Sequence, residues 1–245
     1  MTGDEGKDAR SLRVIAWNIR SGGGERGRSI ADAIAKHEAD VAILIEYRPK
    51  GSAQLLNQIQ SLGYPHAVLS KPAPKIGGVA IVSRLPLVEE PCVSESDPFV
   101  SRILMARVPD AGFLVCGLYG PLKSEAFAEG WGSLLRPVRE RANEAVLVAG
   151  DLNTGAPTLD SPERRFFGSE FFAEISAAGY TDLWRREHGD DAREHSWFGR
   201  TNGYRIDHAF ASASLLPRVE KCWYSHLERE QKMSDHSAVL VDLTT

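Results

Sequence analysis

Short apolar segments with the composition of β-strands recur along the chain, and their order most constrains the fold. An apolar run over residues 12–19 precedes a helical pattern over 29–37, and a second run over 41–45 precedes a helical pattern over 52–62. Several strand-like runs then follow one another, separated by turns that contain proline or glycine. A strand, a helix and further strands follow again from residue 145 onward. This order predicts two packed sheets with helices on their outer faces.

The other elements follow from the same patterns. Further strands are predicted at residues 78–83, 88–93, 102–108, 113–118, 145–149, 206–211, 219–223 and 238–241. Helical spacing covers residues 124–140, where Pro137 is expected to kink or end the helix, and residues 166–178. Because nothing resembles a linker, we predict a polar tail over residues 1–11 and one domain over 12–245.

Length and composition exclude several classes of protein. The chain has 245 residues, 42% hydrophobic and 25% charged, which is typical of a globular protein rather than a disordered one. No apolar run approaches the roughly 20 residues of a membrane-spanning helix, and residues 1–13 lack the apolar core of a secretory signal. Three widely spaced cysteines argue against a disulfide framework or a cysteine zinc site. We therefore expect a cytoplasmic monomer without a membrane anchor. Its net charge of −4 weighs against coating of nucleic acid by charge alone, but not against a nucleic-acid enzyme.

Polar side chains stand at the ends of several predicted strands. They are Asn18, Glu46, Asp151, Asn153, Asp207, Asp235 and His236. Strand ends meet at a common rim, so residues far apart in the sequence can converge there. Oxygen atoms on short side chains suit a hard cation such as Mg²⁺ or Mn²⁺. Any one of these residues alone is more often a turn former, a rim carboxylate or a structural histidine, so the prediction rests on the whole set.

Six short motifs carry a family resemblance. They are Trp17-Asn18, Glu46, the segment 77–87, Gly150-Asp151-Leu152-Asn153, Arg205-Ile206-Asp207-His208 and Ser234-Asp235-His236. In this order they resemble the motifs of the endonuclease/exonuclease/phosphatase superfamily, and the resemblance runs from about residue 12 to residue 243. It implies a four-layered α/β sandwich, with two packed and mainly antiparallel sheets flanked by helices. It also implies hydrolysis of phosphodiester bonds with a divalent cation, Mg²⁺ or Mn²⁺.

The resemblance further implies a metal site. Glu46 resembles the family's principal metal-binding carboxylate. Asn18 would lie beside it, as a ligand or as a residue that orients metal-bound water. Asp235 resembles the acid that lies near the metal on the last loop.

The same resemblance implies the catalytic residues. Asp151 would orient or deprotonate the attacking water, and Asn153 would hold that water or a phosphate oxygen. Asp207 would hydrogen-bond to His236 and fix its tautomer, so that the other ring nitrogen faces the scissile phosphate. Tyr119 resembles the phenol that exonuclease III-like members place near the phosphate. Such groups stabilise the charge that builds on phosphoryl oxygens.

The substrate is less closely defined by the sequence. Leu122 stands where exonuclease III-like enzymes usually have an asparagine, whereas Asn18-Ile19-Arg20 resembles deoxyribonuclease I. We expect a DNA endonuclease or exonuclease. The first alternative is hydrolysis of an inositol phosphate, a phospholipid head group or another small phosphoester. The second is a binding module without activity, which the presence of all the family's carboxylates argues against.

Overall fold

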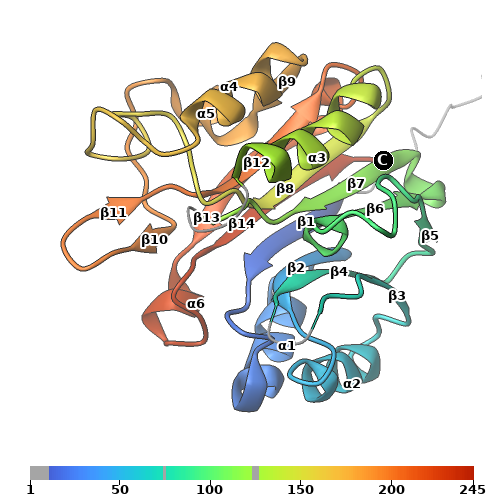
Figure 1. Ribbon diagram of the computed structural model, residues 1–245. Coiled ribbons are helices and arrows are strands. Elements are labelled where there is room, and N and C mark those ends of the chain that lie inside the picture. The colour runs from blue at the N-terminus through green and yellow to red at the C-terminus, as the bar shows by residue number, and fades with distance from the viewer. Residues whose placement is uncertain (1–10, 74–75, 123–126) are drawn as a thin grey trace, which may run out of the picture.

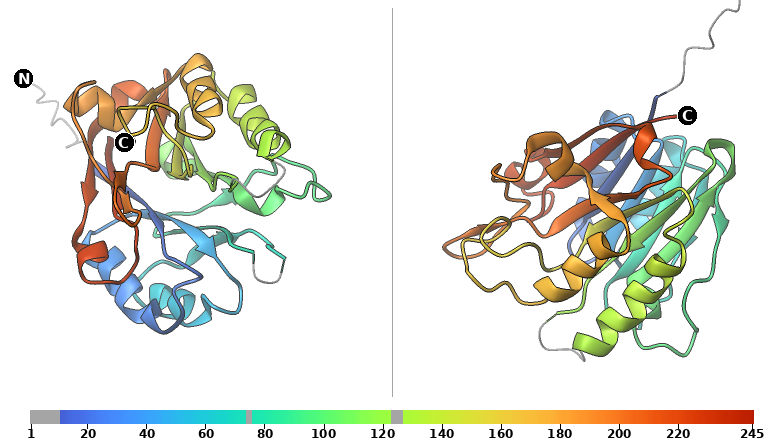
Figure 2. Two further views of the ribbon diagram at one scale, coloured as in Figure 1. Left: turned by 60° about the vertical axis from the view of Figure 1, so that its left-hand side comes forward. Right: turned by 90° about the horizontal axis from the view of Figure 1, so that it is seen from above.

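Two six-stranded sheets lie face to face at the centre of the molecule, and helices cover their outer faces (Figure 1). The computed structural model describes residues 11–73, 76–122 and 127–245. In the left view of Figure 2, the blue and cyan helices lie on one side of the sheets and the green and orange helices on the other. These layers confirm the predicted α/β sandwich.

The first sheet joins the two ends of the described chain. Its strands, in spatial order, are β13 (Val219–Ser225), β14 (Ala238–Thr244), β1 (Ser11–Asn18), β2 (Val41–Tyr47), β4 (Gly78–Ser83) and β3 (His66–Leu69). Among the named strands of this sheet, only β1 and β2 pair in parallel, because helix α1 (Gly27–Lys36) connects them; the other neighbours are antiparallel.

The second sheet is built in the same way. Its strands, in spatial order, are β5 (Val88–Glu89), β6 (Ile103–Val108), β7 (Phe113–Leu118), β8 (Val146–Asp151), β12 (Asp207–Ser212) and β9 (Tyr180–Asp182). Here β7 and β8 form the one parallel pair among the named strands. A separate hairpin consists of β10 (Trp197–Phe198) and β11 (Gly203–Tyr204).

The helices divide between the two outer faces. The α-helices are α1 (Gly27–Lys36), α2 (Ala53–Ser61), α3 (Phe127–Glu140), α4 (Ser169–Ala177), α5 (Leu183–His188) and α6 (Leu227–Glu230). Short 3₁₀ turns occupy Gly24–Arg26, Val100–Arg102, Pro109–Ala111 and Leu216–Arg218. Apolar residues of α1 and α2 pack on the first sheet, and those of α3 and α4 pack on the second. No helix of the described residues has both the length and the apolar character needed to cross a membrane.

The central strands are buried on both faces, which explains their nearly continuous apolar sequences. In β2, Ile43 and Ile45 belong to the apolar layer between the sheets, whereas Leu44 packs toward α1 and α2. The two sheets approach closely at Gly117 of β7. A Cβ atom there would lie 2.7 Å from Cγ2 of Ile43 and 2.5 Å from Cγ1 of Val79, so glycine is required. This tight packing holds the strand ends of both sheets in a fixed relation.

The structure corrects several predicted boundaries. The predicted tail over 1–11 is one residue too long, because Ser11 already pairs with Thr244; residues 1–10 lie outside the described chain. The predicted strand 88–93 ends at Glu89, and Pro91 follows. Helix α3 continues past Pro137 to Glu140, because only its last turn follows the proline; residues 124–126 lie outside the described chain. The prediction of one domain over residues 12–245 stays a prediction.

Candidate active site

The polar residues predicted at strand ends gather at one end of the two sheets. Asn18 is the last residue of β1, and Asp151 is the last residue of β8. Asp207 is the first residue of β12 and pairs directly with Asp151 in the antiparallel register. Each sheet therefore brings its own polar groups to the same rim, and hydrogen bonds between these groups connect the two sheets.

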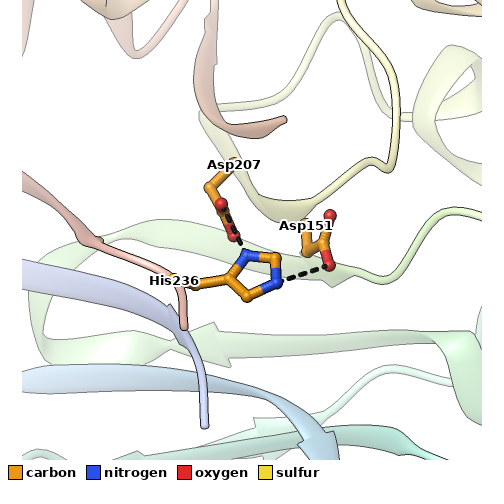
Figure 3. Close-up of side chains that lie close together, drawn as sticks. All are labelled: Asp151, Asp207 and His236. Carbon is orange, nitrogen blue, oxygen red and sulfur yellow. Dashed lines mark hydrogen bonds and ion pairs between the residues drawn. The ribbon is translucent and has the colours of Figure 1, made fainter. Parts of the chain in front are cut away.

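His236 lies between two carboxylates. Its Nδ1 atom donates a hydrogen bond of 2.8 Å to Oδ2 of Asp207, and its Nε2 atom lies 4.0 Å from Oδ2 of Asp151 (Figure 3). The imidazole is buried, and Nε1 of Trp17 donates to the backbone carbonyl of His236 over 3.1 Å. The ring is therefore fixed in position, with one nitrogen committed to Asp207 and the other turned toward Asp151.

Burial and close charges shift the pKa values of this group. Burial raises the pKa of Asp151 to about 7, and the charge of Asp207 adds to the rise. Burial lowers the pKa of His236, but the charges of Asp207 and Asp151 outweigh it and raise that pKa to about 10. In the absence of a metal ion, His236 is therefore cationic at neutral pH. Its Nε2–H group is then a donor for a negatively charged oxygen.

Glu46 and Asn18 form the second part of the site. Nδ2 of Asn18 donates to Oδ2 of Asp151 over 2.9 Å and to Oε1 of Glu46 over 3.3 Å. The hydroxyl of Tyr119 donates to the same Oε1 atom over 3.4 Å, and the backbone N–H of Ser21 donates to Oε2 over 2.7 Å. The pKa of Tyr119 is raised, first by burial and then by the charges of Asp151 and Glu46, so its phenol keeps its proton.

The backbone is unusual where Glu46 leaves the sheet. Glu46 has φ 62°, and the register of β2 against β4 shifts between Ile45 and Tyr47. Positive φ is uncommon for a side chain of this kind, and such strain is often found at functional sites. The bulge turns the Glu46 carboxylate toward the rim. Gly77 passes so close that a Cβ atom there would lie 3.0 Å from Cα of Glu46.

Asn153 also has a left-handed backbone, with φ 52°. Its backbone N–H donates to Oδ1 of Asp151 over 2.9 Å, and its side-chain Nδ2 donates to the carbonyl of Gly120 over 3.0 Å. The backbone bond holds Oδ1 of Asp151, whereas Asn18 holds Oδ2 of the same carboxylate. The Asn153 side chain itself is anchored beside the site.

Asp235 lies farther out than the other predicted residues. Its side chain is 44% exposed, and its recorded ion pair is with Nε of Arg20, over 3.9 Å. Among the described residues, no hydrogen bond or ion pair joins Asp235 to Glu46. The structure thus places Asp235 on the outer rim, next in sequence to His236 but apart from the buried carboxylates.

Several supporting residues had no clear signal in the sequence. Oγ of Ser196 accepts hydrogen bonds from the backbone N–H groups of Ile206 and Asp207, over 3.0 and 3.1 Å. The guanidinium of Arg102 lies under the ring of Tyr119, 4.4 Å from its centroid. Trp197 forms a backbone bridge with His236, and the centroid of its ring lies 6.3 Å from that of the imidazole. These residues lie around the site in space but are far apart in the sequence.

The Arg205 side chain, two residues before Asp207, serves a separate purpose. It is completely buried and forms ion pairs of 2.6 Å with Asp160 and with Asp182. Asp207 is also buried, and its carboxylate bonds to His236 rather than to Arg205. The buried ion pairs fix the turn from which β12 begins.

Two sets of ligand atoms are candidates for a cation. One carboxylate or imidazole atom from each of Asp151, Asp207 and His236 lies within 4.8 Å of the others. However, His236 is protonated at neutral pH in this arrangement, and its Nδ1 atom is committed to Asp207, so this set is poorly suited to a metal. The carboxylates of Glu46 and Asp151 share the amide of Asn18. Their close negative charges, together with the raised pKa of Asp151, fit a site that a hard cation would stabilise.

Comparison with known proteins gives a consistent picture. The model of the Endonuclease/Exonuclease/phosphatase family matches residues 15–236. An AP endonuclease structure from Archaeoglobus fulgidus aligns with a TM-score of 0.79 and 18% identity, over 94% of this chain and 98% of that chain. Two structures of NExo from Neisseria cover 96% of this chain and 100% of theirs. The 3′-phosphatase bound to a product DNA hairpin has a TM-score of 0.78 and 20% identity, and the 3′-5′ exonuclease from Neisseria meningitidis 0.75 and 22%. Comparison with curated proteins finds no significant match.

Proposed function

This chain belongs to the endonuclease/exonuclease/phosphatase family, whose members are metal-dependent hydrolases of phosphoesters, and we propose that it hydrolyses phosphodiester bonds of DNA with the help of Mg²⁺ or Mn²⁺. The observation that carries this proposal is the position of His236, held by Asp207 on one ring nitrogen and facing Asp151 with the other. Such a pair offers a proton donor and a base on either side of one small space.

We assign the cation to Glu46, with Asp235 at the outer edge. Asn18 turns its NH₂ group toward Glu46 and Asp151 while its oxygen accepts from the backbone N–H of Arg20, so it positions these carboxylates beside the cation. Carboxylate and amide oxygens are the ligands that Mg²⁺ and Mn²⁺ prefer, and Glu46 is held by Ser21 and Tyr119 in one orientation. When bound, a divalent cation supplies positive charge that stabilises a phosphoryl group as negative charge builds on its oxygens.

The chain's own groups then have distinct roles. Asp151 takes a proton from the attacking water, because a carboxylate with a pKa near 7 is suited to act as a base at neutral pH. The water oxygen bonds to phosphorus as the bond to the leaving oxygen breaks, and the leaving oxygen takes a proton from solvent and is released as an alcohol. His236 donates its Nε2–H group to a phosphoryl oxygen, and Asp207 keeps the imidazole charged and oriented. The second N–H of the Asn153 amide donates to the same phosphoryl group, and Tyr119 contributes by holding Glu46 in place.

DNA is the substrate that the similar structures favour. The Archaeoglobus protein is an AP endonuclease, and one Neisseria structure contains a DNA product. The same Neisseria structure is described as a 3′-phosphatase, so a phosphate at a DNA end belongs among the substrates to be tested.

Cleavage of supercoiled plasmid tests this proposal. The purified protein is incubated with Mg²⁺ or Mn²⁺, beside reactions with EDTA and with the Asp151→Asn variant. We expect nicking that both controls abolish. Oligonucleotides with an abasic site, a recessed 3′ end or a 3′ phosphate then distinguish endonuclease, exonuclease and phosphatase action. If a folded protein that binds Mg²⁺ cleaves none of these DNAs, DNA is the wrong substrate and a small or lipid phosphoester takes its place.

A further inference from the structure

A second hollow adjoins the candidate active site on the side of the hairpin β10–β11. Its volume is about 350 Å³, and its lining consists of Arg20, Phe198, Arg229, Lys232, Ser234 and Asp235. Three of these six side chains are cations and one is a carboxylate. Helix α6 and the β10–β11 hairpin, which supply Arg229 and Phe198, lie at the same end of the molecule (Figure 1). We call this feature the basic hollow.

Arg229 is oriented in the basic hollow, near the charges of Glu194 and Glu230 but without an ion pair among the described residues. Its guanidinium carbon lies 4.3 Å from the centroid of the Phe198 ring, and its Nη2 atom donates to Nδ1 of His226 over 3.3 Å. Within the described part of the chain, no carboxylate forms an ion pair with Arg229, and its buried Nε atom has no hydrogen-bond partner. A guanidinium that is held flat by an aromatic ring and lines a solvent-open hollow is well suited to bind an oxyanion through its terminal N–H groups.

Lys232 adds an exposed ammonium group to the same hollow. It lies beyond the end of α6 with φ 60°, and it forms no recorded ion pair with the described residues. The cation Arg20 is only loosely associated with Asp235, over 3.9 Å. The lining therefore carries a net positive charge, although the chain as a whole carries −4. A local excess of positive charge on an acidic protein favours a negatively charged ligand at this place.

The basic hollow and the candidate active site share their walls. The backbone N–H of Arg20 donates to Oδ1 of Asn18 over 2.9 Å, and Oγ of Ser234 donates to the carbonyl of Asn18 over 2.6 Å. The backbone N–H of His236 in turn donates to Oγ of Ser234 over 3.2 Å. A group bound in the hollow is therefore next to the place where His236 would meet the scissile phosphate.

The side chain of Arg26 connects two of the loops that line the basic hollow. Its Nη2 atom donates to the carbonyl of Arg20 over 2.6 Å, and its Nη1 atom donates to the carbonyl of Met233. One side chain thus ties together the two loops that supply Arg20 and Lys232. Arg20 and Ser21 both have positive φ, and the glycines 22–24 continue that left-handed path. This loop follows β1 directly, so its position is set by the same strand that carries Asn18.

From these contacts we propose that the basic hollow binds a second phosphate of the substrate, the neighbour of the scissile phosphate on the same DNA strand. This inference rests on the proposed function. Arg229 and Lys232 bind the phosphate oxygens, and Arg20 closes the side toward the active site. Phe198 is a positioning residue that holds the Arg229 guanidinium. A site for two successive phosphates selects a polynucleotide over a phosphomonoester or a small diester, which has no second phosphate to offer.

Equilibrium binding of DNA tests the inference without catalysis. A fluorescein-labelled 16-base-pair DNA duplex is titrated with the protein in EDTA, and its anisotropy is followed at several salt concentrations. The double variant Arg229→Gln/Lys232→Gln is compared with Arg136→Gln/Arg139→Gln, which removes the same two charges from α3 on the outer face of the second sheet. Lys232→Gln alone is added, because its exposed side chain can change without affecting folding.

We expect the Arg229/Lys232 variant to bind DNA about 10- to 50-fold more weakly at low salt, with the slope of log K against log salt smaller in magnitude by roughly 2. Lys232→Gln should lower that magnitude by about 1, and the Arg136/Arg139 control should change neither quantity. Phe198→Leu should weaken binding less than the loss of Arg229 and leave the slope unchanged.

If the parent protein binds DNA and the Arg229/Lys232 variant matches it, the basic hollow is not a phosphate site while the proposed function stands. If the parent protein does not bind DNA at the lowest salt, the basic hollow is not a phosphate site, and plasmid cleavage with Mg²⁺ decides the proposed function separately.

Discussion

Asp207 accepts a hydrogen bond of 2.8 Å from Nδ1 of His236, and this one contact determines which imidazole nitrogen faces Asp151. Asp207 reaches His236 because it begins β12, next to Asp151 in the sheet, while His236 comes from the loop before β14 in the other sheet. The pair therefore joins the two sheets at the rim. Both side chains are buried, so the ionic hydrogen bond is little weakened by solvent.

Replacing Asp207 with asparagine should remove the charge that keeps His236 protonated. Because the charge of Asp207 is the leading influence that raises the pKa of His236, that pKa should fall. We expect the hydrolysis rate to fall by about 10²- to 10⁴-fold, as is usual for loss of acid–base catalysis. Steady-state kinetics on a defined oligonucleotide measure the effect. The double variant Asp207→Asn/His236→Asn should be hardly slower than either single variant, because the two residues act as a unit. Fully additive losses would show that they act separately.

NMR titration of the metal-free protein checks the electrostatics of the site directly. The carboxyl carbon of Asp151 should titrate near pH 7 and the imidazole of His236 near pH 10, because both lie in a buried, charged group. In Asn18→Ala, the Asp151 carboxylate loses a hydrogen-bond donor to its charged form, so its pKa should rise further. An Asp151 resonance that titrates below pH 5 in the parent protein would contradict the environment described here.

Much of this arrangement follows from the sequence, for identifiable reasons. The strand over residues 78–83 is found at those residues, because six consecutive buried positions leave a clear apolar run. The predicted helix 166–178 begins only at Ser169, because Gly168 has φ 83° and cannot continue a right-handed helix. The strands His66–Leu69 and Tyr180–Asp182 were not predicted, since pieces of three or four residues carry too little periodicity.

The positions of the side chains around the site depend on contacts between residues far apart in the sequence, which no local sequence pattern reveals. The family motifs indicated Asp207 and His236, and the structure brings them within hydrogen-bonding distance. The stacking of Arg229 on Phe198 joins a four-residue helix to a two-residue strand, and neither element has a signal of its own in the sequence. The outer position of Asp235 was likewise not visible, because the motif shows its neighbour His236 but not where each side chain points.

Divalent cations should stabilise the folded protein. A ligand that binds only the folded state at 100 times its Kd adds about 2.7 kcal/mol to the free energy of unfolding. For a chain of this size, that corresponds to a rise of roughly 5–10 °C in Tm. The rise should be larger at pH 8 than at pH 6, because Asp151, whose pKa is about 7, adds a negative charge beside the cation only after it has lost its proton. Differential scanning fluorimetry with Mg²⁺ measures it. Glu46→Gln should lose most of the shift, whereas a full shift in that variant would place the cation elsewhere.

The ion pairs of Arg205 should make the free energy of unfolding depend on pH in the acidic range. Burial tends to raise the pKa of Asp160, but the charge of Arg205 outweighs it and lowers that pKa to about 2. A carboxyl group whose pKa is lowered in the folded protein stabilises the fold fully at pH values above its pKa in the unfolded chain, near 4. This stabilisation is lost as the pH falls toward 2. The contribution is about 2 kcal/mol. Urea unfolding between pH 6 and pH 2.5 should show a smaller loss for Asp160→Asn than for the parent protein.

At neutral pH, Asp160→Asn should itself lower the free energy of unfolding by about 3–5 kcal/mol, because it leaves part of the charge of Arg205 buried without its partner. Asp110→Asn, on an exposed turn, is the matched control and should change little. Equal stability of the Asp160 variant and the parent protein would show that Asp182 alone balances the charge of Arg205.

Gly77→Ala should displace Glu46 without adding or removing a charge. The added Cβ atom would lie 3.0 Å from Cα and 3.3 Å from Cβ and Cγ of Glu46, and this backbone cannot yield easily because Glu46 already has φ 62°. We expect weaker binding of Mg²⁺, by about tenfold, since a ligand displaced by a few tenths of an ångström no longer meets the narrow geometry that Mg²⁺ requires. Isothermal titration calorimetry measures the affinity.

Gly132→Ala is the control: nothing lies within 4 Å of its Cβ position on α3, and alanine there should stabilise the helix by up to about 1 kcal/mol. Unchanged Mg²⁺ affinity in a folded Gly77→Ala protein would mean that the cation does not depend on the position of Glu46.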